Sequence, residues 1–248
     1  MQQKSRVSIP AHARERFDDA RRVFVLTGAG VSAESGVPTF RGGGGAALWK
    51  GIPFDVISSA RMVERDLRAV WEWFDYRREL LKSVRPNPAQ DCMAAWQNRF
   101  ERLTVATQNI DGLHAAAGSR GVLELHGNIW TARCVECCER EDVRQLDSHP
   151  RPPVCRACAG EMRPDVVLFG EMLPVETWTR AAEAAATCDV CVVVGTSAIV
   201  HPAASLPLAA KEAGAYLVEV NPERTPLSDL CDATIQGPAG EALPLFDS

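Results

Sequence analysis

The sequence predicts an α/β protein with a doubly wound parallel sheet and a second, smaller domain. Short runs of β-branched and apolar residues alternate with stretches of helical spacing along most of the 248 residues, which is the order of strands and helices in a parallel sheet. A glycine-rich turn follows the first apolar run, as in Rossmann-like folds. Two CxxC pairs interrupt the alternation and indicate a small metal-bound insertion.

The first strand is expected at residues 23–27, VFVLT, directly before the glycine turn. Gly28, Gly30 and Ala33 fit the GxGxxA pattern, whose small residues make the turn, admit a pyrophosphate and let helix and strand pack closely. The following SGVP should end the helix early, and the four glycines at 42–45 suggest a mobile loop that closes over a ligand. A convincing ribose-binding acid about 20 residues downstream is missing, which disfavours a dehydrogenase.

Helices outside the sheet are expected before and after this turn. Residues 11–22 are polar and compatible with a surface helix. Residues 55–82 have helical spacing and predict a helical module outside the sheet. Asn87 followed by Pro88 predicts the start of another helix that runs to about Phe100.

The remaining elements alternate, with one interruption. Strands are predicted at 103–107, 122–128, 165–169, 189–194, 215–220 and 233–236, and helices at about 175–187, 202–213 and from 239 onward. Residues 130–163 are rich in Cys, Arg, Glu and Pro and poor in large apolar groups. Such a segment cannot bury enough apolar surface to fold alone and needs a staple.

Composition excludes several classes of function. Hydrophobic content of 46% and charged content of 24% are those of an ordinary globular protein. The net charge of -5 argues against a nucleic-acid binder that neutralises phosphates generally. No apolar run approaches the roughly 18 residues of a membrane span, and the N-terminal residues have no apolar core of the signal-peptide kind, so a cytoplasmic location is expected.

Four of the nine cysteines have the spacing of metal ligands. Cys134 and Cys137 form one CxxC, Cys155 and Cys158 form another, and 17 residues separate the two pairs. Four thiolates can close a tetrahedral zinc site with no position left for substrate, so the zinc is expected to be structural. A nucleic-acid-binding zinc ribbon and a redox-active CxxC are less favoured, and iron at the four thiolates stays open.

Polar residues follow two of the predicted strands. Asn109 and Asp111 come just after residues 103–107, where ligands bind in parallel α/β sheets, although an Asx turn that caps the next helix can coexist with that role. His126 is expected at the same edge, where its near-neutral titration suits a general base. A solitary histidine is more often a packed or surface residue, and the other four histidines are left unassigned.

These motifs together resemble the sirtuin family of NAD-dependent protein lysine deacylases, and within it the class III, bacterial-type branch. The resemblance extends over nearly the whole chain in the family's order. It is carried by GAGVSAESGVPTFRG from Gly28, QNID at 108–111, HG at 126–127, GTS at 195–197, NPE at 221–223 and the cysteine quartet.

The resemblance implies NAD as a co-substrate, structural zinc, and acyl-lysine proteins or peptides as partners of a monomer. The acyl oxygen would attack C1′ of the nicotinamide ribose, nicotinamide would leave, and a base would activate a ribose hydroxyl. The expected Rossmann-like NAD-binding domain comprises residues 1–45, 86–127 and 164–248. The small domain comprises the helical module 46–85 and the zinc ribbon 128–163.

The resemblance also assigns residues to the site. The catalytic set is His126 with Asn109 and Asp111, the latter two lining the nicotinamide pocket. The set that binds NAD is Gly28, Ala29, Gly30, Ser32, Ala33, Glu34, Pro38, Thr39, Phe40, Arg41, Gln108, Asn109, Ile110, Asp111, Gly195, Thr196, Ser197, Asn221, Pro222, Glu223 and Ala239.

Two segments are expected to meet the substrate. Residues 165–171 resemble the segment along which an extended peptide adds as a strand, with contacts from Val167, Phe169, Gly170 and Glu171. Phe74 and Arg77 stand where class III members pair a tyrosine with an arginine to bind acidic acyl groups. A solvated helix face is the alternative for Arg77 and Arg78.

Rival functions remain at this stage. A protein mono-ADP-ribosyltransferase on the same fold would share every NAD-binding residue, and product analysis would separate the two. A zinc module that binds NAD or ADP-ribose without catalysis is disfavoured by the presence of His126, Asn109 and Asp111.

Overall fold

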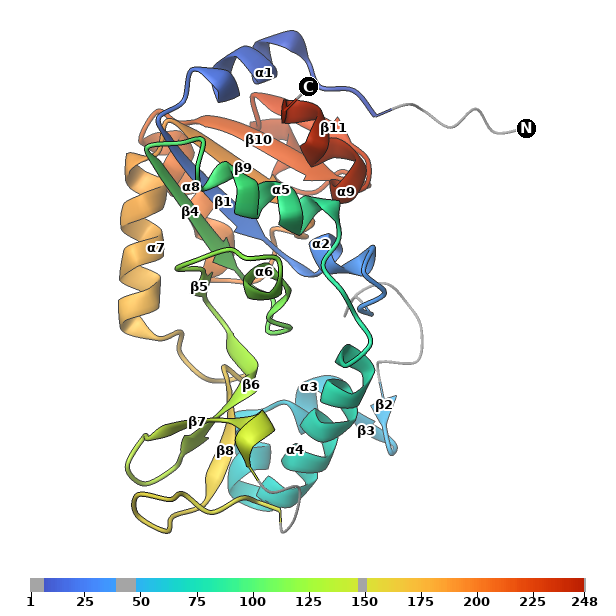
Figure 1. Ribbon diagram of the computed structural model, residues 1–248, viewed down its shortest axis with the longest axis vertical. Coiled ribbons are helices and arrows are strands. Elements are labelled where there is room, and N and C mark those ends of the chain that lie inside the picture. The colour runs from blue at the N-terminus through green and yellow to red at the C-terminus, as the bar shows by residue number, and fades with distance from the viewer. Residues whose placement is uncertain (1–6, 39–47, 147–150, 248) are drawn as a thin grey trace, which may run out of the picture.

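The computed structural model describes residues 7–38, 48–146 and 151–247. Its large sheet has the strand order β11-β10-β9-β1-β4-β5, and every neighbouring pair is parallel. Helices cover both faces (Figure 1), so the predicted doubly wound fold is confirmed. The strands are β1 Arg22–Thr27, β4 Arg102–Thr107, β5 Leu123–Glu124, β9 Val190–Val194, β10 Tyr216–Asn221 and β11 Ala233–Gln236.

Strand order reverses at the centre of this sheet. From β1 the chain proceeds to β4 and β5 on one side, and later to β9, β10 and β11 on the other. In open parallel sheets, ligands bind beyond the carboxyl ends of the strands at such a reversal. The glycine turn after β1 and the GTS segment after β9 therefore meet at the expected ligand site.

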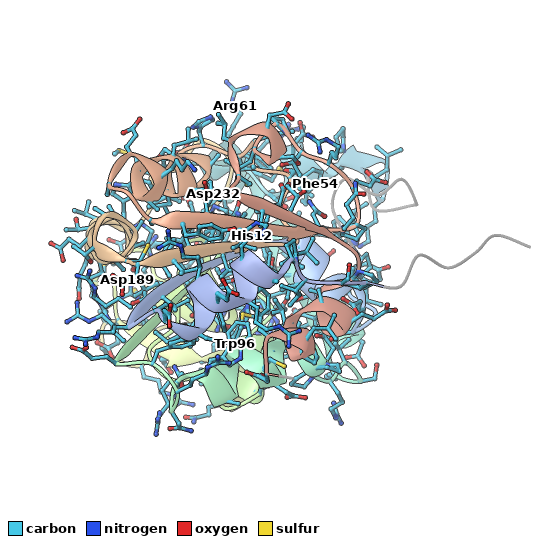
Figure 2. All side chains as sticks on the ribbon, turned by 90° about the horizontal axis from the view of Figure 1, so that it is seen from above. His12, Phe54, Arg61, Trp96, Asp189 and Asp232 are labelled. Carbon is cyan, nitrogen blue, oxygen red and sulfur yellow. The ribbon has the colours of Figure 1, made fainter. Side chains whose placement is uncertain are left out.

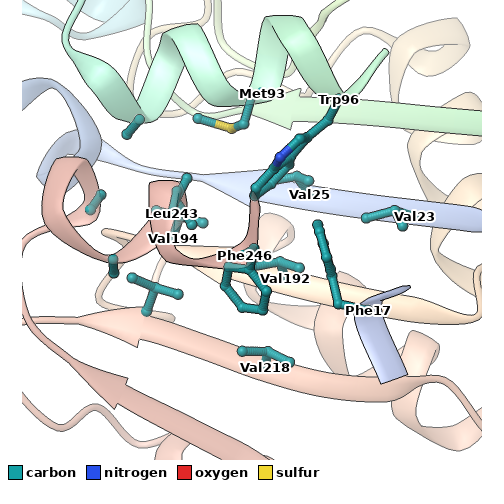
Figure 3. Packing of buried hydrophobic residues seen from close by; sticks show 14 of the residues in the cluster. Phe17, Val23, Val25, Met93, Trp96, Val192, Val194, Val218, Leu243 and Phe246 are labelled. Atoms are coloured by element: carbon teal, nitrogen blue, oxygen red, sulfur yellow. The ribbon is translucent and has the colours of Figure 1, made fainter. Parts of the chain in front are cut away.

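One face of the sheet is covered by α1 Ala11–Asp18, α5 Pro88–Trp96, α9 Ala239–Ala242 and the final 3-10 turn η4 Leu243–Asp247. Phe17 packs edge-on against Trp96 at 4.7 Å between ring centroids and contacts Phe246 at 4.5 Å. Figure 3 shows these rings over the valines of the central strands. The helix α5 begins with a capping box of Asn87 and Gln90, as the Asn-Pro pair predicts, and ends at Trp96 rather than near Phe100.

The opposite face of the sheet is covered by α7 Val175–Thr187 and α8 Leu206–Glu212, which follows the 3-10 turn η2 Ala203–Ser205. The contacts are mostly between alanines and the aliphatic side chains of the strands. Another 3-10 turn, η3 Ser228–Leu230, precedes β11. Seen from above, the polar ends of the side chains lie around the rim of the molecule (Figure 2). In the described ranges, no helix is both long and apolar enough to span a bilayer.

A second lobe lies below the large sheet in Figure 1. It contains the antiparallel sheet β7-β6-β8, the hairpin β2-β3 and two helices that pack on them. Its elements are β2 Leu48–Trp49, β3 Ile52–Pro53, α3 Phe54–Ile57, α4 Ala60–Leu81, β6 Gly127–Cys134, β7 Arg140–Asp142, η1 Val143–Gln145 and β8 Met162–Val166.

Two predicted strands differ from the structure. The strand predicted at 122–128 is divided: only β5 pairs with the parallel sheet, and from Gly127 the chain enters β6 of the lower sheet. The strand predicted at 165–169 begins earlier, as β8, and pairs antiparallel with β6 instead of resuming the parallel sheet. In both places the local apolar pattern indicates a strand correctly but does not identify its partner.

Candidate functional site

The glycine turn after β1 crosses directly over the end of β9. The Gly28 amide donates to Val194 O at 3.0 Å, and the Gly30 amide donates to Gly195 O at 2.7 Å. A Cβ at Gly30 would lie 2.7 Å from Gly195 Cα, and one at Gly195, where φ is +58°, would lie 2.4 Å from Val31 N. A Cβ at Gly28 would likewise lie 2.7 Å from Thr196 Cβ, so all three glycines are required for the two loops to pass at this distance.

Asn109 joins the loop after β4 to this turn. Its Nδ2 donates to Gly28 O and to Ser32 Oγ, both at 3.0 Å, and its amide donates to Thr107 Oγ1 at 3.0 Å. Ser32 is buried in the short helix α2 Ala29–Ala33, which ends early as the sequence predicts. The structure thus brings the QNID segment and the glycine turn together.

Asp111 lies two residues further along the same loop and is only 8% exposed. Burial raises the pKa of its carboxyl, while the Leu113 amide, which donates to Oδ1 at 2.9 Å, and the charge of Arg77 oppose the shift. The Leu113 contact is the anticipated Asx turn, ahead of α6 Leu113–Ala116. The indole Nε1 of Trp130 donates to Asp111 O at 2.8 Å and fixes the main chain.

His126 lies in the hinge between β5 and β6. Its Nδ1 is 2.8 Å from Gln108 O, and because a carbonyl can only accept, Nδ1 carries the proton and Nε2 keeps its lone pair. Burial lowers the pKa of His126, and the bond to Gln108 O partly offsets that shift. The imidazole is therefore neutral near pH 7, with Nε2 able to accept a proton.

The four predicted cysteine ligands converge at the far end of the lower lobe. Their Sγ atoms all lie within 4.8 Å of one another. Cys134 and Cys158 are 3.4 Å apart at Sγ, and Cys137 and Cys155 are 3.7 Å apart. A tetrahedral zinc with Zn–S bonds of about 2.3 Å holds its sulfurs about 3.8 Å apart, so the quartet fits zinc.

The predicted substrate segment bridges His126 and the helical module. The Val167 amide donates to His126 O, and the Phe169 amide donates to Ser58 O, both at 2.9 Å. Glu171 is held by the chain itself: its carboxylate accepts from Arg163 at 2.5 and 3.0 Å and from the Leu168 amide at 2.8 Å. Glu171 therefore shapes the turn, whereas Phe169 and Gly170 are exposed on it.

With this geometry in place, the comparisons with known proteins decide the family. The Sir2 family model matches residues 28–202. The chain belongs to the Sir2 family. An NAD-dependent protein deacylase of Ralstonia nicotianae is 49% identical over 241 residues, 97% of this chain and 96% of the relative. NAD-dependent protein deacylase 2 of Pyrobaculum aerophilum is 49% identical over 227 residues, 91% of this chain and 89% of the relative.

Solved Sir2 structures agree with this assignment. A Sir2 homolog–NAD complex superposes with a TM-score of 0.89 at 38% identity, covering 97% of this chain and 93% of the other. A Sir2 bound to acetylated peptide superposes with a TM-score of 0.82 at 28% identity, covering 93% of each chain.

The other predicted NAD-binding residues of this Sir2 chain lie around the place where the strand order of the large sheet reverses. Gln108 donates through Nε2 to Thr196 Oγ1 at 2.9 Å, and Asn221 donates through Nδ2 to Thr196 O at 3.0 Å. Glu34 accepts from the Gly240 amide at 2.9 Å, next to the buried Ala239. Ala29 and Ala33 lie in α2, and Pro38 follows that helix. Ile110 is buried in the lower-lobe core. Ser197 follows Thr196, and Pro222 and Glu223 are exposed after β10.

Part of the predicted set cannot be placed. Thr39, Phe40, Arg41 and the glycines at 42–45 lie outside the described residues. The described polar groups nonetheless fit a dinucleotide. Amide, hydroxyl and carboxyl groups from the ends of β1, β4, β9 and β10 converge on one reversal point, beside glycines that leave the backbone accessible.

Arg77 and Arg78 of α4 do not form a solvated face. Arg77 is half-buried, its guanidinium 5.7 Å from the centroids of the Trp73 and Phe74 rings. Burial lowers the pKa of Arg77 to about 10, and the Asp111 charge opposes the shift. Arg78 is 4% exposed and donates to Ile129 O and Asp75 Oδ1, each at 2.8 Å. Arg78 is therefore structural, whereas Arg77 faces the aspartate of the site.

The sequence assigns His114 no role, yet this residue belongs to a chain of hydrogen bonds that reaches Asn109 through Thr27 and Thr107. Its Nε2 is 2.9 Å from Thr27 Oγ1, which donates to Thr107 Oγ1 at 2.8 Å. Thr107 in turn accepts from the Asn109 amide. The sequence signal that could have indicated this hydrogen-bond chain is the threonine at the carboxyl end of each of two central strands, Thr27 of β1 and Thr107 of β4.

The burial of His114 predicts a pH-dependent stability. Burial lowers the pKa of His114 to about 4, below the ordinary value of about 6.5. The histidine thus contributes stability that is complete above about pH 6.5 and is lost as the pH falls toward 4. From pH 7.5 to pH 5 we expect this group to cost about 2 kcal/mol of unfolding free energy. Urea unfolding of the native protein and of His114→Gln checks this, and equal pH slopes would contradict it.

Proposed function

We propose that this protein is an NAD-dependent protein lysine deacylase whose products are free lysine, nicotinamide and O-acyl-ADP-ribose. Relatives that are 49% identical over most of the chain carry the name NAD-dependent protein deacylase. Solved relatives include complexes with NAD and with acetylated peptide. The observation that carries the proposal is His126, whose Nδ1 is held by Gln108 O so that Nε2 is left as an acceptor.

NAD, when bound, supplies the glycosidic bond between nicotinamide and C1′ of its ribose. The acyl oxygen of the substrate would replace nicotinamide at this carbon. The chain's own residues position and shield this reaction. The turn from Gly28 to Gly30 and Ser197 would hold the phosphates, and Asn221 would hold the adenosine ribose. Asp111 would accept from the nicotinamide carboxamide, and Asn109 holds the pocket against the turn.

Proton transfer is assigned to His126. Its Nε2 would take the proton of a ribose hydroxyl, while the Gln108 carbonyl holds the opposite side of the ring. A pKa lowered by burial keeps this imidazole in the basic form at neutral pH. The substrate lysine would reach the base along the segment that starts at Val167, because the Val167 amide is bonded to His126 O.

The zinc is proposed to be structural, because all four protein ligands are cysteines and no fifth group is needed. We also retain the division into two domains and a cytoplasmic monomer that acts on acyl-lysine proteins, with the second boundary of the small domain moved from 163 to beyond β8, because Met162–Val166 pair with β6 of the lower lobe. None of the nine cysteines, all of which lie in the described ranges, forms a disulfide, which suits a reducing compartment. The net charge of -5 speaks against general nucleic-acid binding.

Mass spectrometry tests the proposed function directly. An acetyl-lysine peptide incubated with NAD and the protein should lose its acetyl group while O-acetyl-ADP-ribose and nicotinamide accumulate. A peptide that gains ADP-ribose would instead identify a mono-ADP-ribosyltransferase. An unchanged peptide with intact NAD would identify a binding module.

The residue pair Phe74 and Arg77 predicts a preference for acetyl over succinyl groups. Phe74 is fully buried and has no hydroxyl to offer a carboxylate, so of these two residues it is Arg77 that can bind an acidic acyl chain. One missing hydrogen bond costs about 0.5–1.5 kcal/mol. Phe74→Tyr should therefore raise the succinyl-to-acetyl ratio of kcat/KM about 2- to 10-fold. Phe74→Leu is the control, and a strong succinyl preference of the native protein would refute the idea.

A further inference from the structure

Three arginines occupy directly paired positions across the lower sheet. Arg133 of β6 is opposite Arg140 of β7 on one side and Arg163 of β8 on the other. We name these three residues the arginine row. Paired positions share one face of a sheet, with Cβ atoms about 4.5–5.5 Å apart, and like charges there are destabilising. The row therefore needs counter-charge.

Two carboxylates supply that counter-charge, and they are used unequally. Arg163 is 7% exposed and fully engaged with both oxygens of Glu171 and with Val166 O. Asp165 is shared: its carboxylate accepts from Arg140 Nε at 2.7 Å, and Arg133 Nε lies 3.4 Å away. The row thus carries three guanidinium charges against two carboxylates.

Arg133 is the member with unused binding capacity. Its Nε is buried and has no hydrogen-bond acceptor among the described residues, since 3.4 Å to Asp165 is too long for a good hydrogen bond. About one third of its side chain is exposed. It lines two adjoining hollows, of about 350 and 240 Å³. The exposed Glu64 borders only the smaller one.

The larger hollow opens beside the proposed substrate segment. Its lining includes Arg133, Arg140, Val167 and Met172, together with Asp165 and Glu171, the two carboxylates already paired with the row. Residues 163, 165 and 167 alternate along one extended stretch, so Val167 continues the face that bears the arginine row. The same Val167 is bonded through its amide to His126 O. A polypeptide that lies along this segment would carry its side chains past the hollow.

We infer that Arg133, assisted by Arg140, forms a subsite for the carboxylate of an aspartate or glutamate that neighbours the acyl-lysine in the protein substrate. This subsite rests on the proposed deacylase function and adds a sequence preference to it. Arg133 would donate to the carboxylate from its guanidinium, and the bound anion would complete the charge balance of the row.

A glutamate scan measures the preference. Acetyl-lysine peptides carry a single Glu, or Gln as the matched neutral residue, at each position flanking the lysine. At one or two adjacent positions we expect kcat/KM to be about three- to tenfold higher for Glu than for Gln. Arg133→Gln should bring this ratio close to one, and Arg140→Gln should lower it partially. Arg144→Gln, an exposed arginine paired with Asp142 outside both hollows, should leave it unchanged.

A salt titration of the native protein keeps the test independent of variant folding. The Glu-to-Gln ratio should shrink as NaCl is raised from 50 to 500 mM, because a partly exposed ion pair is screened. A ratio near one at every position, or an unchanged ratio in a folded, zinc-loaded Arg133→Gln, would overturn the subsite. If no acetyl peptide is turned over, the proposed function fails, whereas turnover without a Glu preference removes only the subsite.

Discussion

Replacing His126 by alanine is expected to lower kcat/KM for an acetyl-lysine peptide by about 10²- to 10⁴-fold, the usual contribution of a general base. The imidazole is the one group at the hinge whose free nitrogen can accept a proton while its other nitrogen is held by Gln108 O. His126 lies between β5 and β6, and its bond to the Val167 amide is made by its main-chain oxygen, which alanine also has. The substitution should therefore leave the fold intact. Steady-state kinetics with zinc analysis checks both parts.

The pH profile distinguishes a base from a structural histidine. Since burial lowers the pKa of His126, the acid limb of kcat/KM should fall through a pKa below the ordinary value of about 6.5. His12→Ala, an exposed histidine on α1, is the matched control and should keep native rates. Turnover retained in His126→Ala would remove the assigned base.

Most of the parallel sheet was predictable because each strand there is a compact apolar run next to a turn signal. The strand predicted at 233–236 and the helix predicted at 175–187 coincide with β11 and α7. The errors fall at the two crossings between lobes. The run 122–128 has one uniform pattern, yet its pairing changes at Gly127, because the partner of Gly127 is Val166, 39 residues further along the chain. Local periodicity carries no information on such a partner.

The candidate site was predictable where polar residues follow strands. Asn109 and the glycine turn meet as the parallel register requires. Three features required the three-dimensional arrangement: the His114–Thr27–Thr107 chain, the burial of Arg78, and the pairing of Glu171 with Arg163. In each, the partner is remote in sequence or the residue type is usually exposed. The sequence therefore indicated which residues gather at the ligand edge but not which of them support the others.

Removing one zinc ligand is expected to unfold the zinc-bound segment, residues 128–163, and to abolish turnover. The cluster that Cys134 and Cys155 join contains few large side chains, chiefly Trp71 and Met162. Such a small core cannot offset the conformational entropy of its loops. Structural zinc contributes about 10–16 kcal/mol of apparent binding free energy, which is folding free energy for the segment it closes. Cys155→Ala should thus lose the metal.

The unfolding that follows zinc loss should not extend past His126 into the large sheet. The large sheet has its own cores on both faces, so its amides should stay protected from hydrogen exchange while those of residues 128–163 lose protection. Turnover should still disappear, because β6 and β8 carry the chain to His126 and Val167. Cys138→Ala is the matched control: this exposed cysteine adjoins the quartet without belonging to it and should retain metal and activity. Stoichiometric zinc with native protection in Cys155→Ala would show that three thiolates suffice.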